Sequence, residues 1–191
     1  ENIYNKFQIH YLKDDSSKLT IEDIKKQEFF QTTKNNFNLG YVKGTVWFKF
    51  NVKNSSEVEN FILTLNEIFY ETANLYYEKN GEIKKLSNSL FTLIKDREVK
   101  SNQIAFNLTL PKDEEKTIYL ELQGKYAYFG KVEIYHKENF YFKQPLGINA
   151  IFIFSLGIIF ILSFFTLFLY SKTKEKIYLY YLAYNFFLFI Y

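Results

Sequence analysis

The sequence has 191 residues and a net charge of +3, from 24 Lys and Arg against 21 Asp and Glu, and 21% of its residues are aromatic. The lysines alternate with acidic residues instead of clustering, which argues against a nucleic-acid-binding protein. The absence of Cys excludes disulfides, thiolate metal sites and a cysteine nucleophile.

Two short patterns near the N-terminus predict local structure. The segment IHYL around Ile9 is typical of a short strand. Further along, Thr20 and Asp23 have the spacing of a helix-capping box, so we expect one or two helical turns at residues 20–26. The sequence contains no Met, which either a cleaved secretory signal peptide or an engineered start would explain.

Alternating apolar and polar residues predict several strands between residues 45 and 136. In TVWFKFNVKN every second residue from Val46 to Val52 is apolar, as in a strand with one face on a core. The alternation recurs in FILTLN, QIAFNLTL and TIYLELQ, and more weakly in NLYYEK and VEIYH. Turn residues separate these segments and no long helical pattern lies between them. We therefore predict an all-β domain built as an antiparallel sandwich.

Residues 146–170 form a long uncharged stretch. As a helix of 25 residues it would be about 37 Å long, enough to cross a hydrocarbon layer of about 30 Å. The core helix of a soluble protein is the alternative, but such helices rarely stay apolar on every face over this length. We predict a transmembrane helix here.

The flanking residues predict the orientation of this helix. The loop SKTKEK at residues 171–176 has three Lys and one Glu, and short positively charged loops stay in the cytoplasm. Residues 1–145 are therefore expected outside the cytoplasm. Residues 177–191 are uncharged but too short to cross a bilayer, so we expect the first part of a second transmembrane helix.

A connector at residues 137–145 joins the two predicted parts. Its aromatic run Phe140, Tyr141 and Phe142, followed by Pro145, has the composition of an aromatic belt at the membrane interface, with a helix-start signal. An aromatic cluster without that role is the alternative.

Several segments together resemble the bacterial seven-transmembrane receptors with diverse intracellular signalling modules. They are YLKDDSSKLTIEDI, LGYVKGTVWFKFNVKN and the basic loop followed by YLYYLAYN. Residues 7–136 are similar to the type 2 extracellular domain of that family, and residues 146–191 to the opening of its seven-helix region. The most specific signature comprises Gly40, Tyr41, Gly44, Trp47, Phe48 and Phe50.

The resemblance implies a jelly-roll-like sandwich related to carbohydrate-binding modules. It also implies a sensor domain at residues 1–136 and a bacterial inner-membrane location with residues 1–145 in the periplasm. A cytoplasmic output such as a histidine kinase or diguanylate cyclase would lie outside this chain. The family often carries an Arg where this chain has Glu121 or Gln123, so a ligand contact by that Arg is not carried over.

Residues suited to catalysis are sparse. The only histidines are His10 and His136, and neither has a partner at metal-ligand spacing. Glu114 and Glu115 are adjacent in a predicted turn, where they do not face each other across a cleft as glycosidase carboxylates do. We predict that this chain is not an enzyme and holds no cofactor or metal.

Recognition of a small molecule is better supported, and five candidate residues lie on the polar faces of strands. Trp47 and Lys49 oppose the apolar face of their strand, where an aromatic ring could stack against a sugar. Coverage of Trp47 by the N-terminal segment or a loop is the alternative. Tyr76, Tyr119 and Glu121 are the other three candidates.

The loop GKYAYFG at residues 124–130 supplies two further candidates. It is flanked by Gly and is expected to expose Tyr126 and Tyr128, since loops at the end of a sandwich often carry binding residues. Packing of these side chains against the membrane-proximal aromatic run is the alternative.

The expected function is ligand sensing outside the cytoplasm. A carbohydrate or another small molecule would bind the sandwich and change its packing on the membrane helices. The rival function is a membrane-anchored adhesion or assembly module that docks a protein partner. The expected partners are the lipid bilayer, a small ligand and, through an exposed sheet edge, a second copy of the chain.

Overall fold

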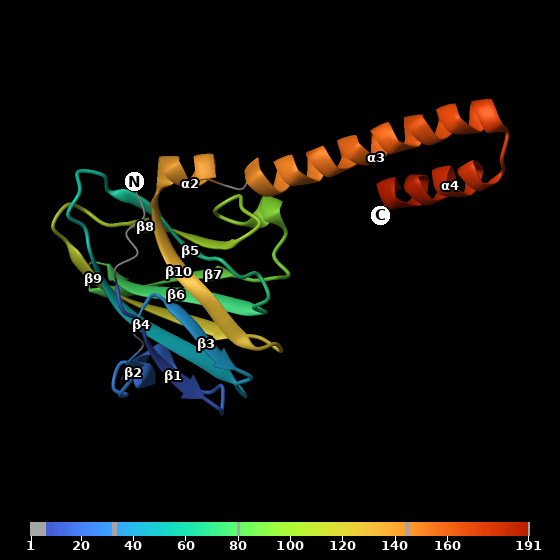
Figure 1. Ribbon diagram of the computed structural model, residues 1–191. Helices are drawn as coiled ribbons and strands as arrows, with labels where there is room; N and C mark the ends of the chain where they lie inside the picture. The colour runs from blue at the N-terminus through green and yellow to red at the C-terminus, as the bar shows by residue number, and fades with distance from the viewer. Residues whose placement is uncertain (1–6, 32–33, 80, 144–145, 191) are drawn as a thin grey trace. The chain divides into compact units, whose positions relative to one another are not determined.

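The chain divides into two compact units, Glu1–Phe142 and Lys143–Tyr191. The computed structural model describes residues 7–31, 34–79, 81–143 and 146–190. The first unit is a β-sandwich and the second is a pair of helices (Figure 1).

Two antiparallel sheets form the sandwich, as the sequence predicted. The six-stranded sheet has the order β2-β1-β4-β9-β6-β7 and the four-stranded sheet has the order β3-β10-β5-β8. From β3 to β6, and again from β7 to β10, successive strands alternate between the sheets, as in jelly rolls. The strands are β1 His10–Asp14, β2 Phe30–Gln31, β3 Asn36–Gly40, β4 Thr45–Lys53, β5 Asn60–Leu65, β6 Thr72–Lys79, β7 Glu82–Asn88, β8 Ile104–Thr109, β9 Glu115–Gln123 and β10 Tyr128–His136.

The apolar face of each predicted strand points into the core between the sheets. In β4, Val46, Phe48 and Phe50 are buried there, and the rings of Phe48 and Phe37 from β3 lie 4.3 Å apart. Burying each such side chain stabilises the fold by roughly 1.5–3 kcal/mol. The opposite residues of β4 therefore lie on the outer face of the six-stranded sheet.

One glycine of the turn before β4 is required by close packing. Gly44 has a φ of +85°, and a Cβ added there would lie 2.2 Å from the carbonyl oxygen of Asp14. Only Gly combines this backbone conformation with this approach. The turn therefore locks the start of β4 against the end of β1.

Each outer face of the sandwich is partly covered. Helix α1 (Ile21–Ile24) begins at the predicted capping box, in which Thr20 and Asp23 bond each other's backbone, and it packs on the six-stranded sheet. On the four-stranded sheet, Phe140 of α2 (Lys137–Lys143) packs with Ile62 and Val99. The loop that carries Val99 contains the short helix η1 (Ile94–Asp96).

The connector predicted at residues 137–145 is helical over Lys137–Lys143. The prediction that its aromatic run forms a belt at the membrane interface is wrong for Phe140. Phe140 is only 3% exposed and lies against Tyr135, so it belongs to the domain and not to a membrane interface. Tyr141 is exposed, whereas the side chain of Phe142 and all of Pro145 lie outside what the structure describes.

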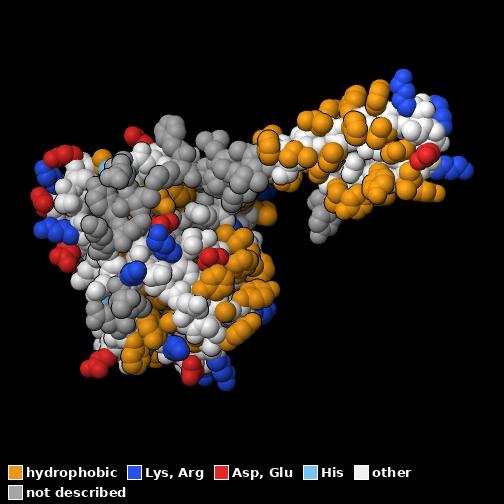
Figure 2. Space-filling view, viewed as in Figure 1, with side chains coloured by type: hydrophobic (Ala, Val, Ile, Leu, Met, Phe, Trp, Pro, Cys, Tyr) orange, Lys and Arg blue, Asp and Glu red, His pale blue; other side chains and the backbone are white. Residues whose placement is uncertain are grey.

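The second unit contains α3 (Leu146–Thr173) and α4 (Ile177–Ile190). Within α3 the segment Phe152–Thr173 is long and apolar enough to cross a membrane, and Figure 2 shows the apolar side chains over both helices. The hydroxyls of Ser163 and Thr166 bond the carbonyls four residues back, which satisfies them within an apolar surrounding.

The loop after α3 is shorter than predicted. Helix α3 continues through Thr173, three residues past the predicted end, and leaves residues 174–176 between α3 and α4. Ser171 and Thr173 bond carbonyls of the preceding turn and neither breaks a helix, so the polar residues prolong the last turn.

Candidate functional site

Five of the seven predicted ligand residues meet on the outer face of the six-stranded sheet. Strand pairing aligns Lys49 of β4 with Tyr119 of β9, and Tyr119 with Tyr76 of β6. The adjacent row aligns Trp47 with Glu121. These five residues, which the sequence suggested one by one, therefore share one surface, although they come from three strands far apart in the chain.

The aromatic part of this surface is covered. Ile24 of α1, which is fully buried, packs against Trp47, Tyr76 and Tyr119, and these rings are 2%, 8% and 8% exposed. The rings of Trp47 and Tyr76 lie 5.5 Å apart. The prediction of an exposed stacking platform at Trp47 is therefore wrong, and the alternative, coverage by the N-terminal segment, is confirmed.

Glu121 is the polar centre of this covered layer. Its Oε2 accepts hydrogen bonds from the hydroxyl of Tyr76 at 2.7 Å and from Nδ2 of Asn74 at 2.8 Å. Burial raises the pKa of Tyr76 above its ordinary value, and the hydrogen bond to Glu121 raises it further. Tyr76 therefore stays a proton donor at neutral pH.

The indole nitrogen of Trp47, unlike the hydroxyl of Tyr76, lacks a hydrogen bond within the described part of the chain. Among the described residues it is buried and has no hydrogen-bond partner. A buried donor without a partner costs about 1–3 kcal/mol. This unsatisfied donor lies in the layer that the ligand prediction singled out.

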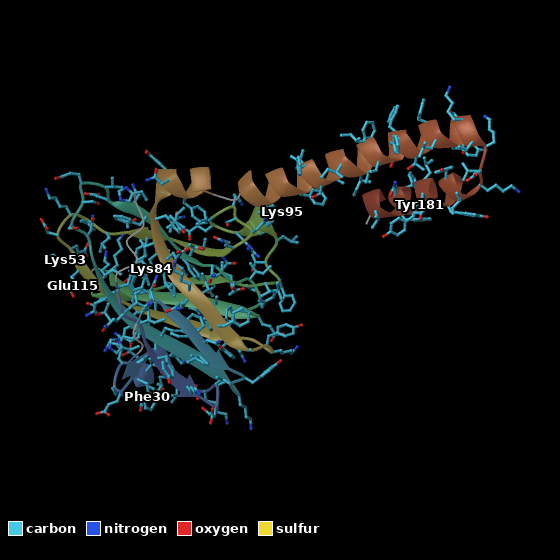
Figure 3. The ribbon with its side chains drawn as sticks, in the orientation of Figure 1. Phe30, Lys53, Lys84, Lys95, Glu115 and Tyr181 are labelled. Carbon is cyan, nitrogen blue, oxygen red and sulfur yellow. The ribbon has the colours of Figure 1, made fainter. Side chains whose placement is uncertain are left out.

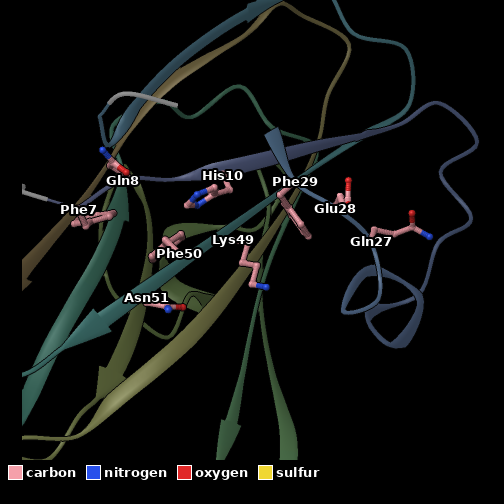
Figure 4. Close-up of a pocket in the computed structure, with 9 residues that line it drawn as sticks. All are labelled: Phe7, Gln8, His10, Gln27, Glu28, Phe29, Lys49, Phe50 and Asn51. Carbon is pink, nitrogen blue, oxygen red and sulfur yellow. The ribbon is translucent and has the colours of Figure 1, made fainter. Parts of the chain in front are cut away.

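A hollow of 930 Å³ opens beside the covered layer (Figure 4). The ammonium of Lys49 lies 5.7 Å from the ring centroids of both Phe29 and Tyr119, so Lys49 connects the hollow with the covered layer. The hollow is lined by Phe7, Gln8, His10, Gln27, Glu28, Phe29, Lys49, Phe50 and Asn51.

The lining of this hollow combines rings with amides and charges. Phe29 offers an aromatic surface, and Gln27 and Asn51 offer both donors and acceptors. Such a mixture suits a small polar ligand with apolar faces. Apart from Lys49, the lining residues were not predicted as ligand contacts, because nothing in the sequence indicates that residues 27–29 return to β4.

A second hollow, of 550 Å³, lies on the other side of the Lys49–Tyr119 pair. Beside that pair, the hydroxyl of Thr117 donates a 3.0 Å hydrogen bond to Asn51. The second hollow is lined by Ile21, Lys25, Tyr76, Tyr77, Glu78, Ile83, Glu114, Glu115, Lys116, Thr117 and Tyr119. Two predicted candidates, Tyr76 and Tyr119, thus line it.

The remaining two candidates lie elsewhere, Tyr126 in the turn between β9 and β10 and Tyr128 at the start of β10. The expectation that Tyr128 is exposed is wrong, because its ring is fully buried and its hydroxyl donates a 2.7 Å hydrogen bond to the carbonyl of Gly44. Tyr126 is 61% exposed and its ring lies 6.3 Å from that of Phe69. Among the described side chains, neither residue packs against Phe140 or Tyr141 of α2, which follows the opposite end of β10.

The comparisons with known proteins identify a family. The family described as 7TMR-DISM extracellular 2 matches residues 6–146. No curated protein matches the chain.

Two solved structures show a distant likeness. One is a β-glucosidase from Kluyveromyces marxianus in complex with glucose, at 11% identity and a TM-score of 0.36, with 68% of this chain and 15% of that chain covered. The other is the PA14 domain of the antifreeze protein MpAFP, at 8% identity and a TM-score of 0.32, with 72% and 85% covered. At these scores neither structure bears on the ligand of this chain.

The sandwich, the helix that could span a membrane and the match over residues 6–146 agree with one another. The chain belongs to the 7TMR-DISM extracellular 2 family, the type 2 extracellular domain of seven-transmembrane receptors.

Proposed function

We propose that this chain is the extracytoplasmic ligand-sensing region of a bacterial inner-membrane receptor. A carbohydrate or another small polar molecule binds the outer face of the six-stranded sheet, beside Lys49. The signal passes through α3 to a cytoplasmic output domain outside this chain. Family membership supports the receptor role, and the surface described above supports the ligand class.

The observation that carries the proposal is the position of Lys49. It lines the 930 Å³ hollow and lies over the rings of Phe29 and Tyr119. A ligand in the hollow would contact both Lys49 and Phe29, the last residue of the segment that covers Trp47 and Tyr76. Binding would therefore act on the covering segment and on β4 together.

The route toward the membrane is short. Strand β10 ends at His136, α2 begins at Lys137, and buried Phe140 fixes α2 to the sandwich. A connection of this kind transmits a displacement of the sheet. The ligand shifts the receptor equilibrium only by its difference in affinity for the two states.

A thermal-shift screen of residues 1–142 tests the proposal. These residues form a compact unit with their own core, and a ligand that binds only the folded state raises its melting temperature. We expect a hit among sugars, nucleosides and small organic acids. The substitution Lys49→Met should remove the shift and keep the fold, because it retains most of the aliphatic stem.

The matched control is Lys84→Met on β7. Lys84 pairs with Tyr77, whose ring lies in the core, and Lys84 lines neither hollow. This variant should respond to the ligand as the wild type does. An unchanged melting-temperature shift in Lys49→Met would show that the ligand binds away from Lys49. A screen without any hit would count against a small-molecule sensor.

A protein-docking function remains as the second candidate because of one apolar cluster. Phe69, Tyr126 and Phe129 are exposed, and the ring of Phe69 lies 6.3 Å from the ring of each of the other two. The substitution Tyr126→Ser distinguishes this function. Self-association of residues 1–142 in sedimentation, lost in that variant, would favour a homodimer or another protein partner.

A further inference from the structure

The loop between β7 and β8 exposes an unusual number of apolar side chains. Phe91 is 72% exposed and Leu93 is 60% exposed, and Leu90 and Ile94 are exposed beside them. Four large apolar side chains within five positions form a patch of the kind that marks a protein or membrane contact. We call residues 90–94 the apolar loop.

Arg97 holds this loop in a fixed shape. Its guanidinium is buried and donates hydrogen bonds to the backbone carbonyls of Ser89 at 3.2 Å and Thr92 at 2.9 Å. It also donates to the carbonyls of Ser101 at 3.0 Å and Gln103 at 3.2 Å. The planar guanidinium of Arg97 thus joins the first and last parts of the β7–β8 loop. These bonds fix the backbone from which the apolar side chains point outward.

A later part of the β7–β8 loop packs against α2, the helix that leads toward the membrane. Val99 is fully buried against Phe140 of α2, in a cluster with Ile62 and Ala105. Figure 3 shows Lys95, next to the apolar loop, at the end of the sandwich where α2 lies. Only residues 143–145 separate Phe142 from the start of α3. Chain length alone therefore keeps Phe142 within about 14 Å of the start of α3.

We propose that α3 crosses a bilayer and that the apolar loop inserts into the headgroup region of the leaflet that faces the sandwich. Interfacial apolar groups enter the headgroup and acyl boundary by about 5–10 Å. Lys95 follows the loop directly, and its long stem allows the ammonium to stay at headgroup level. The loop would then form a second, non-covalent contact between sandwich and membrane.

A lipid surface fits this loop better than it fits the exposed cluster around Tyr126. The Tyr126 cluster lies at the start of β10, whereas α2 follows the end of that strand at His136. A strand of nine residues is about 30 Å long. The two apolar surfaces adjoin where the N–H of Leu90 donates a hydrogen bond to the carbonyl of Tyr70, but the β7–β8 loop continues to Val99, which packs on α2. Of the two surfaces, the loop is therefore the one tied to the route to α3.

Site-specific fluorescence in a bilayer tests the proposal. The full chain would be reconstituted into vesicles of phosphatidylethanolamine and phosphatidylglycerol. Because the sequence has no Cys, the variant Phe91→Cys carries one environment-sensitive label, and Tyr126→Cys is the matched control at another exposed aromatic residue. We expect blue-shifted emission at position 91 and several-fold stronger quenching by nitroxide-labelled lipids than at position 126.

Two outcomes would overturn the proposal. Equal, water-like emission at both positions would show that the loop stays in solvent. Blue-shifted emission at position 91 without quenching by the labelled lipids would show that a protein surface covers it. Neither outcome involves a ligand, so the experiment separates this inference from the proposed sensing function.

Discussion

The hydroxyl of Tyr76 donates a 2.7 Å hydrogen bond to Oε2 of Glu121 on the neighbouring strand β9. The same oxygen accepts a hydrogen bond from Asn74, which pairs directly with Glu121 across β6 and β9. One carboxylate thus holds two donors from the adjacent strand beneath the layer that α1 covers.

Replacing this carboxylate should weaken the outer layer. We expect Glu121→Gln to destabilise residues 1–142 by about 1–2 kcal/mol, because both hydrogen bonds lose their charged acceptor. Urea unfolding measures this loss. The control is Glu82→Gln on the exposed edge strand β7, for which we expect no change; equal effects of the two substitutions would contradict the assigned role of Glu121.

The covering of Trp47 by α1 predicts a fluorescence change. Trp47 is the only Trp, so intrinsic emission reports its surroundings directly. Ile24→Ala should destabilise the domain by about 2–4 kcal/mol and shift the emission to the red, because fully buried Ile24 shields the indole. Lys26→Ala, on the exposed side of the same segment, should leave the emission unchanged. An unchanged spectrum in Ile24→Ala would mean that α1 does not cover Trp47.

The period-two pattern accounts for the strands that were predicted from sequence. Strands β4 and β9 each have one face in the core, and the alternation of apolar and polar residues along them predicts this face. Strand β7 was missed because it lies at the sheet edge, where residues such as Lys84 and Lys85 are exposed and few apolar residues mark the pattern. The two-residue β2 and the short, Asn-rich β3 give no usable pattern either.

The candidate site was predicted in part, for a related reason. Strand parity placed Trp47 and Glu121 on the correct face, but it carries no information on which distant segment covers that face. The same limit hid the contribution of Phe29 to the hollow. Tyr128 was misplaced because β10 begins at that residue, four positions before the predicted start at Val132, and Gly130 interrupts the apolar alternation.

The network around Arg97 predicts a local loss of order. Arg97→Ala removes the guanidinium hydrogen bonds to four backbone carbonyls, and we expect a destabilisation of about 2–4 kcal/mol. Trypsin should then cut faster at Lys95 and Lys100. Arg97→Lys should not restore resistance, because one ammonium does not reproduce the planar fork. Full resistance of Arg97→Lys to trypsin would show that a positive charge alone is enough to hold the loop in place.

The turn after β1 predicts a dependence of stability on pH. Burial, the largest influence, raises the pKa of Asp14, but hydrogen bonds from Ser16, Leu19 and Ser17 together bring it below its ordinary value of 3.8. The folded state therefore favours the carboxylate, so its contribution is present above about pH 4 and is lost as the pH falls further.

Asp14→Asn tests this dependence. The variant should be less stable than the wild type at pH 7, and the difference in unfolding free energy should shrink on acidification below about pH 4. Asp15→Asn changes an exposed neighbour and should show no such convergence. If the difference in unfolding free energy between the wild type and Asp14→Asn stays constant with pH, the Asp14 carboxylate does not cause the pH dependence.

The receptor proposal depends most directly on the sandwich lying outside the cytoplasm, with the loop after α3 inside. Because the chain has no Cys, single variants at Tyr126 and Lys176, both exposed, can be labelled in intact bacterial spheroplasts with a membrane-impermeant maleimide. We expect Tyr126→Cys to be labelled at once and Lys176→Cys only after the membrane is permeabilised. Labelling in the reverse order would contradict an extracytoplasmic sensor.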